Sequence, residues 1–409
     1  MSDSLKPPQP KKIPKVLSAH GDERIDDYYW LRDDTRKDPE VISYLEAENQ
    51  YLEDWFASKG DCRQEIYDEL VSFIPPHEVS MKIKYGDYLY FSEISADQQY
   101  KTYYRELDGI KELVLDVNVL AKGLDYFNVA SLTPSSDNLL IAYAEDLSGR
   151  REYNIKVKDL ASGEIIDSAI ERSSGSVVWD KQNTCIYYAQ KDPITLIENK
   201  VYKHKLGTDA SEDVLIYEEH DTEFHLNIYE SRTKKYLYIY ISKTEASETW
   251  LLDLEDETIK PFCILTRSEK HLYSVEDTPE CFYAISDADD KKNFALLKFS
   301  HAQINDYKSW ETVIEHNSAM LIEDFEAFPN YIYLEVREDG LPKILKMHRQ
   351  TLDKQYIEFS EPAFSCYLAT NNEYQANEFY YGYSSPKKPS SIFKEDIATG
   401  TSELVWQQS

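Results

Sequence analysis

The residues that could carry chemistry in this sequence do not form a familiar catalytic set. No Gly-x-Ser-x-Gly motif occurs, so the usual strand–turn–helix presentation of a nucleophilic serine is missing. The common phosphate, dinucleotide and zinc motifs (GxxxxGK[ST], GxGxxG and HExxH) do not occur either. The sequence therefore predicts no catalytic residue, no cofactor-binding residue and no metal ligand in these 409 residues.

Two weaker patterns could suggest metal sites. His220 and His225 are the closest histidines, but their spacing fits neither face of a helix and no further ligands accompany them. The acidic pairs lack the loop pattern of a calcium-binding EF-hand, and solvated turns explain them better. These pairs are Asp26-Asp27, Asp33-Asp34, and Asp287 with Asp289-Asp290.

One charged loop has two interpretations. Arg150 and Arg151 lie between two predicted strands in the segment AEDLSGRREYNIKVKDL. The pair could simply form a charged hairpin tip. Alternatively, it could contact carboxylates of a partner domain, because guanidinium groups favour bidentate pairing at interfaces.

The elements that must position these residues are mostly strands. Seven short runs alternate apolar and polar residues and carry Tyr, Ile, Val or Phe at period two, which is typical of half-buried strands. Their starts lie 45–53 residues apart, the spacing of propeller blades rather than of a sandwich. The runs begin at Tyr85, Asn138, Thr184, Lys235, Glu280, Asn330 and Asn377.

Further strands flank each run, which gives four antiparallel strands per unit. In the second unit, FNVASLTPSSDN precedes the run and REYNIKVKDL and EIIDSA follow it; SVVWDKQN opens the third unit. The 33 tyrosines fit blades that are buried on both faces. The predicted fold is all-β, a seven-bladed β-propeller of four-stranded blades over residues 77–409. Two stacked β-sandwiches remain the alternative.

Helices are predicted only before residue 77. Asp38 can cap a helix that starts at Pro39, and a second helical stretch ends before Pro75-Pro76. Residues 1–76 are therefore expected to form an arm with helices, separate from the propeller.

Composition excludes some classes of function. The net charge of −30 repels nucleic acid and attracts basic peptides. The sequence shows neither a signal peptide nor an apolar stretch long enough to span a membrane. The cysteines are odd in number and scattered, which favours free thiols in a reducing compartment, so a soluble cytoplasmic protein is expected. They are Cys62, Cys185, Cys263, Cys281 and Cys366.

The segment HGDERIDDYYWLRDDTRKDPEVISYLEAENQY, residues 20–51, carries a family likeness. It resembles the N-terminal signature of oligopeptidase B, or protease II, in the prolyl oligopeptidase family of serine peptidases. The likeness extends through AEDLSGRREYNI to YGYSSPKKPSSIFKEDIATG, close to the end of the chain. The signature R-x-D-x-Y-x-W-L-R-D corresponds to Arg24, Asp26, Tyr28, Trp30, Leu31, Arg32 and Asp33.

The resemblance implies a seven-bladed propeller that gates an α/β-hydrolase domain cutting short peptides after Lys or Arg. In the family that domain follows the last blade, and this sequence stops where it would begin. No cofactor is implied. Residues 1–76 would pack on the hydrolase domain, and Arg150 and Arg151 match the charged loop that faces it.

The sequence analysis therefore favours a propeller that is inactive alone. The alternative is a freestanding acidic propeller that binds basic peptides or a protein partner. An enzyme with its own site at the propeller centre is disfavoured, because no convergent set of histidine and carboxylate residues is visible.

Overall fold

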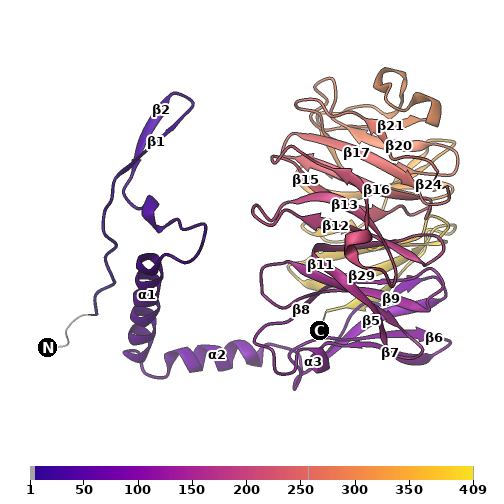
Figure 1. Cartoon of the computed structure of the whole chain (residues 1–409). Helices are drawn as coiled ribbons and strands as arrows, with labels where there is room; N and C mark the ends of the chain where they lie inside the picture. The colour runs from indigo at the N-terminus through magenta and orange to yellow at the C-terminus, as the bar shows by residue number, and fades with distance from the viewer. Residues whose placement is uncertain (1–4, 257, 409) are drawn as a thin grey trace. The chain divides into compact units, whose positions relative to one another are not determined.

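The computed structural model describes residues 5–256 and 258–408 and divides into two compact units, Met1–Pro76 and His77–Ser409 (Figure 1). In the described part of the chain, no helix is long and apolar enough to cross a membrane. Each unit is described by itself below.

The first unit contains one hairpin and two helices. Strands β1 (Lys15–Ala19) and β2 (Asp22–Asp26) pair, and the 3-10 turn η1 (Tyr29–Leu31) leads to α1 (Pro39–Ala57) and α2 (Cys62–Ser72). The Asp38 carboxylate accepts the Glu40 N–H at 2.8 Å, so the predicted cap and helix start are confirmed. Only Val41 is buried in α1 and no residue is buried in α2.

The second unit is a β-propeller whose sheets follow one another along the chain (Figure 1). The first sheet has the order β3-β5-β6-β7, with β4 also paired to β5. These strands are β3 (His77–Val79), β4 (Ile83–Tyr85), β5 (Tyr88–Ser95), β6 (Thr102–Leu107) and β7 (Ile110–Asp116). The one-turn helix α3 (Val117–Leu120), which the sequence analysis did not predict, follows it.

The second sheet has seven strands in chain order. They are β8 (Asn128–Pro134), β9 (Leu140–Asp146), β10 (Tyr153–Asp159), β11 (Ile165–Trp179), β12 (Cys185–Lys191), β13 (Glu198–Lys205) and β14 (Val214–Glu218). The 3-10 turn η2 (Ala210–Glu212) precedes β14.

Four sheets of four antiparallel strands complete the propeller. The first two are β15 (His225–Glu230), β16 (Tyr236–Lys243), β17 (Ala246–Asp253) and β18 (Phe262–Leu265), then β19 (Tyr273–Asp277), β20 (Phe282–Ser286), β21 (Ala295–Phe299) and β22 (Glu311–Ile314). The 3-10 turns η3 (His301–Gln303) and η4 (Tyr307–Ser309) lie before β22. The last two are β23 (Met320–Ala327), β24 (Tyr331–Glu338), β25 (Leu341–His348) and β26 (Lys354–Tyr356), then β27 (Ser365–Leu368), β28 (Glu378–Ser385), β29 (Lys388–Asp396) and β30 (Ser402–Gln407).

All seven tyrosine-rich runs are strands, and the four-stranded antiparallel unit is confirmed for four sheets. The runs form β5, β9, β12, β16, β20, β24 and β28. Their side chains include Tyr143, Tyr187, Tyr238 and Tyr333, each almost fully buried. The tyrosine content therefore fills the space between sheets, as predicted.

The prediction of separate strands for EIIDSA and SVVWDKQN is wrong, because β11 runs through both. Its first half pairs with β10 and its second half with β12, and the change of partner occurs at Ser173. The Ser173 hydroxyl donates to the carbonyl of Tyr153 at 2.9 Å. Arg172 and Gly175 have φ values of 55° and 96°, so the strand bends there without ending.

Six clusters of buried apolar side chains join neighbouring parts of the propeller. One packs the β8–β11 half of the long sheet against the β11–β14 half, through residues such as Ile155 and Ile186. The others join the first sheet to the second, the second to β15–β18, and each later sheet to the next. Within the described residues, none joins β27–β30 to the first sheet.

Candidate functional site at the propeller axis

Antiparallel pairing determines which loops share an end of the propeller. The first strands β3 and β8 begin opposite the last residues of β5 and β9, and β30 ends opposite the beginning of β29. We call the end of the propeller at which the first strand of each sheet begins the near end. The opposite end is called the far end. The chain therefore enters and leaves the propeller at the near end, which also carries the β9–β10 hairpin.

The β9–β10 hairpin presents Arg150 and Arg151. The Asp146 carboxylate shapes it by accepting the backbone N–H groups of Ser148, Gly149 and Arg151, the last at 2.7 Å. Burial would raise the pKa of Asp146, but these hydrogen bonds outweigh burial and lower it. Both arginines are exposed, and Arg150 approaches Glu152 at 3.3 Å. The structure thus supplies an exposed basic hairpin, whereas a contact with a partner domain stays a prediction.

Solvent reaches the propeller axis along the first strands. Alternate residues of β15 are exposed and buried in turn, as expected where one side of a strand faces a central channel. The exposed positions on the first strands are His77, Glu78, Ala130, His225, Asn227, Tyr229, Asp324, Ser365 and Tyr367. We call the space that the first strands enclose the axial channel.

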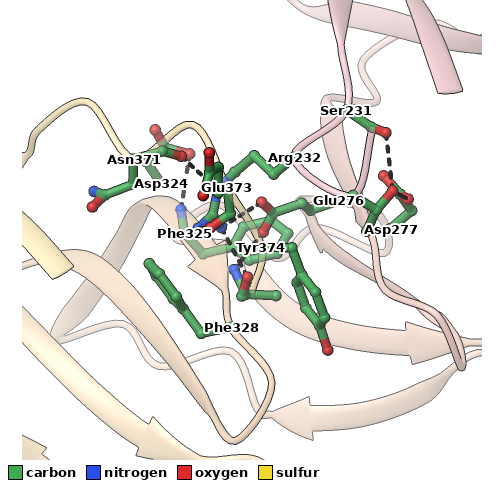
Figure 2. Close-up of polar contacts among 12 residues, drawn as sticks. Ser231, Arg232, Glu276, Asp277, Asp324, Phe325, Phe328, Asn371, Glu373 and Tyr374 are labelled. Atoms are coloured by element: carbon green, nitrogen blue, oxygen red, sulfur yellow. Dashed lines mark hydrogen bonds and ion pairs between the residues drawn. The ribbon is translucent and has the colours of Figure 1, made fainter. Parts of the chain in front are cut away.

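Arg232 ties together four sheets at the far end of the axial channel (Figure 2). It follows β15, and its guanidinium donates to Glu276 Oε1 and the Ala327 carbonyl, both at 2.8 Å. It also donates to the carbonyls of Asn371 at 2.8 Å and Glu373 at 3.3 Å. With these bonds made, Arg232 has little capacity left for another ligand.

Four carboxylates lie on the two first strands, β19 and β23, that Arg232 connects, and their environments differ. Glu276 pairs with Arg232 and accepts the Ala327 N–H. Asp277 accepts the hydroxyls of Thr233 and Tyr238. These polar partners leave the negative charge only partly neutralised, because one guanidinium faces several acids. We call Arg232, Glu276, Asp277, Asp324 and Glu326 the far-end cluster.

Burial has the largest effect on the pKa values of these acids. It raises the pKa of Glu276 and of Asp277 against the opposing effect of their hydrogen bonds. Partial desolvation by the surrounding strands also raises the pKa of Asp324, although the residue as a whole is exposed. For Glu326, burial and the charges of Glu276 and Asp324 outweigh Arg232 and raise the pKa to about 8. An acid that is protonated near neutral pH at a solvent-reached axis marks a candidate binding site.

Hydrogen bonds connect the first and last sheets. Trp406 Nε1 donates to the Val79 carbonyl at 2.7 Å, and the Gly86 N–H donates to Glu373 at 3.3 Å. A pocket of about 320 Å³ lies between β4 and the loop after β27, and another of about 500 Å³ lies between the first sheet, β8 and that loop. We call the contact between the first and last sheets the seam.

The other residues singled out in the sequence do not gather into a site. His220 and His225 are both exposed, and the described residues include no group of three potential ligands that could hold a metal. Asp33 accepts the N–H groups of Thr35, Lys37 and Asp38, so it shapes a turn. Cys281 and Cys366 are buried free thiols.

Sequence reasoning missed the far-end cluster. Its acids lie in the strands YSVED and MLIEDFEA, whose alternation reads as one wet and one buried face. The available signal was acidic residues on first strands, since both faces of a propeller sheet are largely covered. Arg232 resembled an ordinary turn residue in SRTKK.

Comparison with known proteins identifies the family. The model of the prolyl oligopeptidase N-terminal β-propeller domain matches residues 7–408. The chain belongs to this family. The likeness to oligopeptidase B seen in the sequence is thereby supported over the whole propeller.

Individual relatives agree. The chain is 30% identical to dipeptidyl aminopeptidase BI of Pseudoxanthomonas mexicana, covering 100% of this chain and 59% of the relative. It is also 30% identical to protease 2 of Moraxella lacunata, covering 98% and 58%. Oligopeptidase B from Leishmania major superposes with a TM-score of 0.92 at 27% identity, covering 99% of this chain and 61% of that structure. The chain thus spans about 60% of the length of the relatives it matches.

Proposed function

We propose that this family member is the substrate-admitting half of a serine oligopeptidase that cleaves short peptides after Lys or Arg. The observation that carries the proposal is the match to the family propeller over residues 7–408, with 30% identity to protease 2. In the complete enzyme an α/β-hydrolase domain would supply the nucleophile and cover the near end. Residues 1–76 would pack on that domain.

Topology supports this placement of the hydrolase domain. The propeller is entered at β3 and left at β30 on the same end, where Arg150 and Arg151 are exposed. A domain joined to both ends of the propeller would therefore lie against the near end. There the two guanidinium groups would pair with its carboxylates.

We also propose that the ring has seven blades. The long sheet would count as two blades that share β11, because its two halves bond different neighbours and pack a cluster of buried side chains between them. The five other sheets would be one blade each. The seam would then be the seventh contact between blades and the place where the ring opens to admit peptides.

The proposal predicts that the 409-residue chain hydrolyses no peptide by itself. The sequence contains no serine elbow, and no histidine is among the groups shown to contact the acids of the far-end cluster in the described part of the chain, so no serine–histidine pair is available there. The test is the release of a chromophore from an arginyl amide by the purified chain. Turnover that a serine-directed organophosphate abolishes would overturn the proposal.

A second function, a freestanding propeller that binds basic peptides, is favoured by the net charge of −30 and the acids at the axis. Calorimetry with short basic peptides discriminates the two. The second function requires salt-sensitive binding by the 409-residue chain together with no gain of hydrolysis when a hydrolase domain of the family is supplied.

A further inference from the structure

Some acids of the far-end cluster have charged or hydrogen-bonding partners, and others have few. Arg232 donates to Glu276 and to three backbone carbonyls. Asp277 accepts the hydroxyls of Thr233 and Tyr238 and also interacts with Ser231 (Figure 2). The other two acids of the far-end cluster, Asp324 and Glu326, lie two residues apart on β23. Neither forms a salt bridge with a cation among the described residues (Figure 2 shows Asp324 beside the Arg232 contacts).

The two remaining acids differ in exposure. Asp324 is exposed on a first strand, and its carboxylate accepts the Phe325 N–H at 2.8 Å. Glu326 Oε2 is buried and has no hydrogen-bond partner in the described part of the chain. The Asn371 amide interacts with the Glu326 carboxyl and lowers its pKa, but both of its N–H groups already donate to the carbonyls of Ala369 and Tyr380.

A buried carboxyl oxygen without a partner is costly, because its hydration is lost and nothing replaces it. A ligand that brings both hydrogen-bond donors and positive charge would remove this cost. A metal ion fits poorly, since the described residues offer no group of three potential ligands. A guanidinium or ammonium group fits, because it carries both positive charge and several hydrogen-bond donors. Its flexible side chain lets it reach the two carboxyl groups.

We propose that Asp324 and Glu326 bind the cationic end of an arginine or lysine side chain of a peptide that occupies the axial channel. Asp324 supplies the solvent-reached carboxylate, and Glu326 supplies the buried oxygen that lacks a donor. The nature of the ligand as a peptide rests on the proposed function. The site itself rests on the geometry of β23.

Binding at this site would be linked to a proton. Glu326 has a pKa of about 8, so near pH 7 the carboxyl is mostly protonated, and a bound cation favours its ionised form. The charged and titratable groups that influence it are Arg232 after β15, Glu276 on β19 and Asp324 on β23, with the Asn371 amide from the loop after β27. Peptide binding near pH 7 should therefore release about one proton.

Isothermal titration calorimetry of the 409-residue chain tests the proposal. The probe is acetyl-Ala-Arg-Ala-amide, and its citrulline analogue is the uncharged control. The arginine peptide should bind at least about tenfold more tightly than the citrulline peptide, as one charge-assisted hydrogen bond predicts. Its affinity should rise about tenfold from pH 7 to pH 9 as Glu326 ionises. Titration at pH 7 in two buffers of different ionisation heat measures the released proton.

Matched variants assign the effect to these residues. Glu326→Gln should weaken arginine-peptide binding about tenfold and flatten the pH profile, and Asp324→Asn should weaken binding without flattening it. Glu164→Gln removes an exposed acid from the β10–β11 turn and should change neither. Equal affinity for both peptides, or unchanged binding and pH dependence in Glu326→Gln, would overturn the site. Peptidase activity of a complete enzyme is measured separately, so failure here leaves the proposed function standing.

Discussion

The contacts between neighbouring sheets and the seam differ in the interactions that hold them together. The former bury clusters of aliphatic and aromatic side chains, such as Phe379, Tyr333 and Tyr381. The seam is bridged by hydrogen bonds such as that from Trp406 to Val79 and is flanked by pockets. No cluster of buried apolar side chains spans the seam among the described residues, so the ring is expected to open more easily there than at the other contacts.

The largest effect should come from emptying a packed contact. Phe379 is fully buried and stacks on Tyr333 with ring centroids 3.7 Å apart. Phe379→Ala should lower the free energy of unfolding by about 3–5 kcal/mol, because it leaves a cavity. Urea denaturation followed by tryptophan fluorescence measures this. A loss below about 1 kcal/mol would mean that the contact is not tightly packed.

A buried charge within the long sheet should have a comparable effect that depends on pH. The His204 ring is fully buried, with Nδ1 2.6 Å from Asp213 and Nε2 3.1 Å from Asp167. Two carboxylate acceptors require both ring nitrogens to donate, so the ring is an imidazolium. Burial would lower its pKa, but the hydrogen bonds and charges of both aspartates outweigh burial and raise it.

Because the folded-state pKa of His204 lies above the unfolded value of about 6.5, its stabilisation is full below that pH and is lost as pH rises through the folded pKa. Asp167 has a lowered pKa, since hydrogen bonds from His204, Gly207 and Ala169 outweigh burial. Its contribution is present above the unfolded pKa and is lost as pH falls through the folded pKa. His204→Gln should cost about 3–5 kcal/mol at pH 6 and less at higher pH. A pH-independent cost would contradict the imidazolium.

A substitution at the seam should change the free energy of unfolding only slightly but should make local opening of the seam much more frequent. Trp406→Phe removes one hydrogen bond to Val79 and should cost about 1 kcal/mol. Hydrogen exchange should accelerate in β3 and β30 while the amides of β24 and β28 keep their protection. Equal acceleration in both regions would show that the seam is not a separate weak contact.

The smallest effect on the isolated chain is expected at the near end. Arg151 is exposed, so Arg151→Gln should change the free energy of unfolding by less than about 0.5 kcal/mol. In a chain joined to a hydrolase domain of the family, the same substitution should lower the thermal midpoint of the domain contact. Lys260→Gln, at an exposed turn between β17 and β18 at the far end, is the control that should alter neither.

The sequence predicted the second strand of every repeat, because alternating tyrosines and aliphatics report directly on burial at both faces. It also placed the start of α1, since Asp38 and Pro39 act locally. The continuity of β11 was not predictable from ERSSGS, a polar stretch with Gly175 that reads as a turn. Only the pairing with β10 and β12 keeps it in the sheet.

The far-end cluster could not be predicted either. Nothing local in SRTKK reveals that Arg232 reaches residues as distant in sequence as Asn371 and Glu373. Likewise, nothing local in MLIEDFEA indicates that Asp324 and Glu326 lie beside an axis shared by all the sheets. Such sites arise from ring closure, which is a property of the whole propeller.

The central claim, that this propeller admits peptides to a serine hydrolase domain, is tested most directly by joining the two in one chain. The hydrolase domain of Moraxella lacunata protease 2 would follow residue 409, and hydrolysis of a short and a long arginyl peptide would be compared. We predict that the joined chain cleaves the short peptide much faster than the long one and that the 409-residue chain cleaves neither. Equal rates on both peptides, or cleavage by the propeller alone, would contradict the account.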